Sequence, residues 1–179
     1  MAEIAIVKGE TPAGDRTWLT LPDGTARRVP IHVAHDLPHF AVESRFGIED
    51  GLWGVLARGG FSGASRAVTA RHRRLRLVTD EPLDELGARN WPGHLVAKAA
   101  VNAVVNLWRE GPDTPAAVRA RMRSVWMAAG AEDMGDRLRE LAARLDDNTI
   151  AGAIADVRRL CAEWSALQPG DTLRLHWPC

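Results

Sequence analysis

The sequence predicts an α+β fold in which a small antiparallel sheet, formed by the N-terminal strands and the C-terminal strand, packs against a helical bundle. Three observations lead to this prediction. Short β-type segments separated by turns fill the first thirty residues, the chain ends on an alternating segment, and most of the sequence between them has helical periodicity. Because there is no internal repeat or linker, we expect residues 1–179 to form a single domain.

The predicted sheet has three strands near the N-terminus and one near the C-terminus. Pro22-Asp23-Gly24 indicates a hairpin, because Asp-Gly accommodates the positive φ angles of a tight turn. The last strand follows the helix-breaking pair Pro169-Gly170 and can return to the N-terminal strands. The predicted strands are residues 4–7, 17–21, 26–29 and 172–177.

Helical spacing begins after His35. Pro38 is best tolerated in a first turn, so we expect that helix to begin near Leu37 or Pro38 and to end at Gly47. Asp147 or Asn148 is the expected cap of the last helix. The further predicted helices are residues 50–57, 92–109, 115–130, 132–146 and 149–167, whereas residues 71–79 fit either a basic strand or a helix end.

The composition favours a cytoplasmic protein. The formal net charge is +0, with Lys+Arg and Asp+Glu both 23, so no general attraction to nucleic acid or to an anionic membrane is expected. No apolar stretch approaches the ~20 residues of a membrane span, and the start does not resemble a signal peptide. Cys161 and Cys179 form no Cys-x-x-Cys pair, which argues against a zinc ribbon or a thioredoxin-type site.

One segment concentrates the residues capable of chemistry. It runs from His35 to Glu43 and includes Asp36 and His39. His39 and Glu43 are four residues apart and therefore share one face of a helix. Two imidazoles with a carboxylate are the ligand set of catalytic zinc and of non-haem iron sites. We therefore predict a site for zinc, iron or manganese with His35, His39 and Glu43 as ligands. Asp36 would be the catalytic base or would orient one of the ligands.

The same residues also allow other interpretations. His35-Asp36-x-x-His39 has the spacing of the zincin motif, but Asp replaces Glu and Pro38 would distort a zincin helix. A purely structural interpretation is also open: Asp36 would cap the helix, and His39 with Glu43 would form an exposed pair worth about 0.3 kcal/mol.

Two further features lie outside this segment. In the helix at 92–109, His94 begins a line of polar residues at intervals of four, which is either a solvent-exposed side or the wall of a pocket with His94 as a third imidazole ligand. A basic run at 66–76 could contact phosphate, but it lacks interleaved aromatic residues and is better explained as a solvated face.

The segment from His35 to Glu43, the segment from Gly51 to Ala57, and the ending with Pro169-Gly170 and Trp177-Pro178 together resemble a group of uncharacterised bacterial proteins of similar size. These share an HD-x-x-H-F-x-V-E segment and a G-x-W-G-x-L-A segment. The resemblance carries no known activity and implies only a shared architecture around the His-Asp-His-Glu residues.

The favoured hypothesis is a small metal-dependent enzyme, with hydrolysis as the default chemistry and a metal-dependent oxygenase as the alternative chemistry with the same ligands. Its substrate would be a small molecule or a peptide. The rival hypothesis is a non-enzymatic module for protein interaction or homodimerisation, in which the HD-x-x-H-x-x-x-E segment is structural.

Overall fold

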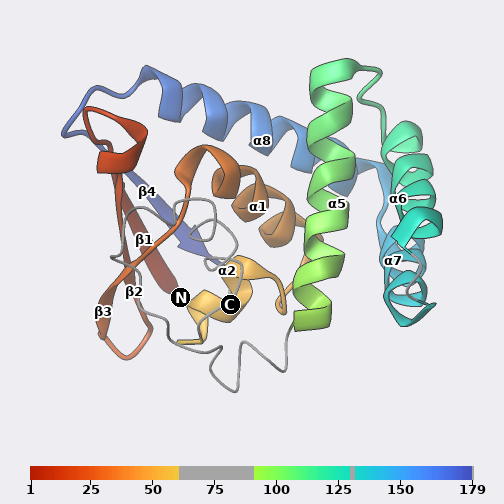
Figure 1. The fold of residues 1–179 in the computed structure, drawn as a ribbon, viewed down its shortest axis with the longest axis horizontal. Helices are drawn as coiled ribbons and strands as arrows, with labels where there is room; N and C mark the ends of the chain where they lie inside the picture. The colour runs from red at the N-terminus through yellow and green to blue at the C-terminus, as the bar shows by residue number, and fades with distance from the viewer. Residues whose placement is uncertain (61–90, 130–131, 179) are drawn as a thin grey trace.

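The computed structural model describes residues 1–60, 91–129 and 132–178, and these form an α+β fold (Figure 1). A four-stranded antiparallel sheet has the strand order β3-β2-β1-β4. The predicted return of the C-terminal strand to the N-terminal strands is therefore confirmed. The strands are β1 (Ala2–Val7), β2 (Arg16–Thr20), β3 (Ala26–Val29) and β4 (Thr172–Trp177).

The sheet buries one face. Side chains alternate across each strand, so Ile4 of β1 and its neighbours Leu19 and Leu175 point toward the helices and are buried. On the opposite face Trp18 is 45% exposed. This alternation is what the sequence pattern of the strands predicts for a sheet covered on one side.

The helices cover that apolar face. Figure 1 shows α1 between the sheet and α5, with α8 crossing beside α1 and with α6 and α7 beyond α5. Phe40 of α1 makes edge contacts with Trp53 of α2 and Trp177 of β4, at ring-centroid distances of 5.6 and 5.7 Å. The helices are α1 (Val33–Phe46), α2 (Leu52–Ala57), α5 (Trp91–Glu110), α6 (Pro115–Ala129), α7 (Glu132–Arg144) and α8 (Asp147–Ala166), with a short 3-10 helix at Pro12–Gly14.

The predicted start of α1 is wrong. The helix begins at Val33, four or five residues earlier than expected, and Pro38 lies in its second turn. Proline has no N–H to donate to the carbonyl of Ala34, but Ala34 is exposed, and burial of Val33 and Leu37 favours the longer helix. As a result, His35 and Asp36 belong to the helix itself. The predicted end is confirmed, because Gly47 closes the helix with a φ of 63°.

The other predicted helices are confirmed to within a few residues. The cap of α8 is Asp146, whose carboxylate accepts from the N–H of Thr149 at 2.6 Å, and not Asp147 or Asn148. The predictions for 66–76 and 71–79 fall outside the described residues. Within the described parts of the chain, no helix has the length and apolar character needed to cross a membrane.

Candidate functional site

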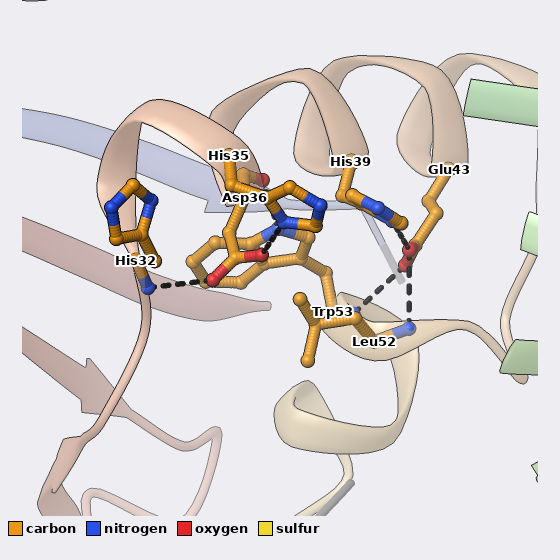
Figure 2. A network of polar contacts seen from close by, with 7 residues as sticks. All are labelled: His32, His35, Asp36, His39, Glu43, Leu52 and Trp53. Atoms are coloured by element: carbon orange, nitrogen blue, oxygen red, sulfur yellow. Dashed lines mark hydrogen bonds and ion pairs between the residues drawn. The ribbon is translucent and has the colours of Figure 1, made fainter. Parts of the chain in front are cut away.

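The candidate site lies on the side of α1 that faces α2. His35, His39 and Glu43 follow one another at intervals of four residues, with Asp36 beside His35, and all four side chains project from this side of the helix (Figure 2). The early start of α1 makes this arrangement possible, because His35 would otherwise lie in a loop. His39 and Glu43 are almost fully buried, whereas the side chain of His35 is 55% exposed.

Glu43 is the most deeply buried member of the site. Its Oε1 forms a hydrogen bond with Nδ1 of His39 at 3.0 Å and accepts another from the backbone N–H of Leu52 at 3.1 Å. Its Oε2 accepts from the N–H of Trp53 at 2.8 Å. Burial raises the pKa of Glu43 above its ordinary value, and these three donors oppose that rise. The carboxylate therefore links His39 to the first turn of α2.

Local sequence explains why Glu43 can reach α2. Gly51 precedes the helix, and a Cβ atom at this position would lie 2.5 Å from the carboxylate carbon of Glu43. Only glycine leaves room for the carboxylate there. The indole N–H of Trp53 then donates to the carbonyl of Asp36 at 2.7 Å, which ties α2 to the first turns of α1.

Asp36 holds the outer histidine. Its Oδ1 lies 2.7 Å from Nδ1 of His35, and its Oδ2 accepts from the backbone N–H of His32 at 2.7 Å. The hydrogen bond with Asp36 is the main reason that the pKa of His35 is raised above its ordinary value. Asp36 therefore both braces the start of α1 and fixes an imidazole.

A third imidazole comes from α5. His94 is buried, and its ring lies nearly parallel to that of His39, with a centroid distance of 6.3 Å and an interplanar angle of 8°. The rings of His35 and His39 are 5.2 Å apart. Burial is the main cause that lowers the pKa of His94 to about 4, and the charges of nearby His39 and Lys98 add to it. His94 is therefore neutral near pH 7.

The contacts with Asp36 and Glu43 determine which ring nitrogens of His35 and His39 are left to bind a ligand such as a metal ion. When it is ionised, a carboxylate only accepts hydrogen bonds, and Nδ1 of the histidine that faces it, His35 or His39, is then the donor. The lone pair of each ring then resides on Nε2. Orientation of a ligating histidine by a carboxylate on its other nitrogen is a common feature of metal sites.

The structure thus brings the predicted site residues together, but not with all their side chains directed at one point. His35, His39 and His94 form a row of imidazoles, while Asp36 and Glu43 lie behind two of them. As the side chains stand, no three His, Cys, Asp or Glu residues in the described ranges form a group that could hold a metal ion.

The contribution of α2 to the site was not predicted from the sequence. The N–H groups of Leu52 and Trp53 and the space left by Gly51 decide how Glu43 lies, and none of them has a chemically reactive side chain. The sequence feature that could have indicated this contact is Gly51-Leu52-Trp53-Gly54, in which a glycine directly precedes a short apolar helix.

No protein-family model, curated protein or solved structure matches the chain. The resemblance to bacterial proteins with the two shared segments therefore stays a prediction. We infer function from the geometry of the row of imidazoles and the two carboxylates behind it.

Proposed function

We propose that the chain is a metal-dependent hydrolase in which Nε2 atoms of His35, His39 and His94 bind one divalent metal ion. The observation that carries this proposal is the pair of carboxylate–histidine contacts beside a third, buried imidazole. Two neighbouring histidines, each with Nδ1 held by a carboxylate and Nε2 left for a ligand, are what a metal centre requires.

The ring separations match a shared metal ion for one of the two neighbouring pairs of histidines. With a zinc–nitrogen bond of about 2.0–2.1 Å, the centroids of two imidazoles on one tetrahedral ion lie about 5–6 Å apart. The observed separations are 5.2 Å for His35 with His39 and 6.3 Å for His39 with His94. The first value lies within this range. His39 and His94 would have to approach each other and leave their parallel arrangement to share an ion, and the neutral state of His94 suits ligation.

Glu43 receives a different role from the one its spacing predicts. Each of its oxygens accepts at least one hydrogen bond, and its side chain is 0% exposed. These contacts favour Glu43 as the residue that positions His39 over direct ligation of the metal. Asp36 positions His35 in the same way. Because it lies on the Nδ1 side of that ring, away from a metal held by Nε2, the contact favours positioning over the role of catalytic base expected from the sequence.

Three imidazoles with open positions suit zinc, iron or manganese, and zinc suits them best because hydrolysis needs no redox change. The metal would supply a water of lowered pKa and would polarise the bond to be cleaved. His39 and His94 would form the buried side of the site. His35 would form the exposed side, where a substrate can arrive.

The second hypothesis is the structural module for protein interaction. It is favoured by the bracing contacts of Asp36 and Glu43, which tie the start of α1 and the first turn of α2. Bracing alone, however, does not account for the buried ring of His94 beside His39.

Only the hydrolase hypothesis predicts a metal-dependent activity, so an activity assay distinguishes it from the structural module. Protein stripped of metal and reloaded with zinc, manganese or ferrous ion would be assayed against chromogenic acetate and phosphate esters. We expect ester hydrolysis that depends on metal and is lost in His39→Ala, with His176→Ala as the matched control because His176 is exposed on β4. Equal hydrolysis by wild type and His39→Ala would contradict the proposal.

A further inference from the structure

A cation accompanies the row of imidazoles. Lys98 lies one turn after His94 on α5, on the same side of that helix, and its side chain is exposed. Its positive charge contributes to the lowered pKa of His94 and opposes the rise in the pKa of His35. Asn102 lies a further turn along the same line and is also exposed.

Lys98 has no carboxylate partner in the described part of the chain. No salt bridge or hydrogen bond between described residues involves it, in contrast to most arginines of the helices. The two carboxylates of the site are already engaged, Asp36 with His35 and Glu43 with His39 and α2. An exposed cation that lacks such a partner can bind an anion.

The net charge of the proposed site with a metal ion bound also favours an anionic ligand. A divalent ion carries two positive charges, and the carboxylates of Asp36 and Glu43 can balance at most these two. The charge of Lys98 then remains, so the loaded site as a whole is positive. A neutral substrate would leave that charge uncompensated, whereas an anionic group would pair with it.

We infer that the substrate of the proposed hydrolase carries an oxyanion, a phosphate or carboxylate group, that pairs with Lys98 while its scissile bond lies over His35 and His39. This inference rests on the proposed metal site and adds the chemical class of the substrate. Lys98 would bind the anionic group of the substrate and would take no part in cleavage of the scissile bond.

Cobalt(II) provides a probe that does not require knowledge of the substrate. Its visible absorption depends on its ligands, so binding of an anion at or beside the metal changes the spectrum. Protein loaded with one equivalent of cobalt(II) would be titrated with inorganic phosphate and, separately, with acetate. The variants are Lys98→Ala and Lys98→Arg, with Arg174→Ala as the control that removes one exposed positive charge from the outer face of β4.

We expect phosphate or acetate to change the spectrum of the wild-type protein with a measurable affinity. That affinity should fall about tenfold in Lys98→Ala, as expected for loss of a charge-assisted contact, and should be largely retained in Lys98→Arg and Arg174→Ala. The anion with the higher affinity identifies the group on the substrate.

The titration distinguishes failure of the inference about Lys98 from failure of the proposed metal site. If the protein binds cobalt but Lys98→Ala binds both anions as tightly as wild type, the inference is overturned while the metal site stands. If the wild-type protein takes up no cobalt, the proposed function and the inference fail together.

Discussion

Replacement of Glu43 by alanine tests the hydrogen bonds at the centre of the site. The change removes the acceptor for three donors, Nδ1 of His39 and the N–H groups of Leu52 and Trp53, in a place with no exposed side-chain surface. A buried donor without an acceptor costs about 1–3 kcal/mol, and three such donors would be left here, although relaxation and water recover part of the loss. We therefore expect the free energy of unfolding to fall by about 4 kcal/mol.

The assay is urea unfolding at 25 °C, followed by tryptophan fluorescence and by circular dichroism. Glu43→Gln keeps the shape but offers a single acceptor oxygen, so its expected loss is smaller, about 2 kcal/mol. The control is Glu49→Ala, because Glu49 is 81% exposed and pairs with Arg58 only at 3.6 Å; its effect should be within about 0.5 kcal/mol. A Glu43→Ala protein within about 1 kcal/mol of wild type would refute this reasoning.

Three further predictions concern the same region. Gly51→Ala should lower the free energy of unfolding by about 1–3 kcal/mol, because the new Cβ would lie 2.5 Å from the carboxylate of Glu43; an unchanged urea midpoint would count against this close approach. Trp53→Phe should cost about 1–2 kcal/mol by the same assay, since the carbonyl of Asp36 loses its indole donor, and a neutral result would show that this bond is dispensable. The pKa of His94 is lowered to about 4, so the unfolded chain binds a proton below about pH 6.5 that the folded chain does not, and stability should fall as pH drops from 6.5 toward 4. Urea unfolding at pH 7.5 and 5.5 checks this, and His94→Gln should show a smaller difference between the two pH values than wild type.

Much of the fold could be predicted from local sequence patterns. Alternation in 172–177 and the hairpin signal at Asp23-Gly24 indicate strands, and their burial pattern in the sheet follows directly. The start of α1 could not be predicted in this way. Pro38 argues locally for a later start, but burial of Val33 and Leu37 against the core, together with the bond from His32 to Asp36, outweighs that preference.

The candidate site was predictable only within α1. The spacing of His39 and Glu43 places them on one helical face, and the structure shows them in contact at 3.0 Å. The contacts that assign their roles are between elements distant in the sequence. The donors for Glu43 come from α2, and the ring beside His39 comes from α5, 55 residues later in the chain, so neither contact can be derived from periodicity.

Metal stoichiometry tests the central claim most directly. Tag-free protein, its His39→Ala and His94→Ala variants, and the control His176→Ala would be equilibrated with zinc, manganese and ferrous ion and analysed by elemental mass spectrometry. The three-histidine site predicts about one equivalent of metal in wild type and in His176→Ala, with loss in both site variants. A wild-type protein that takes up none of the three metals, or one whose metal content survives both site substitutions, would contradict the account.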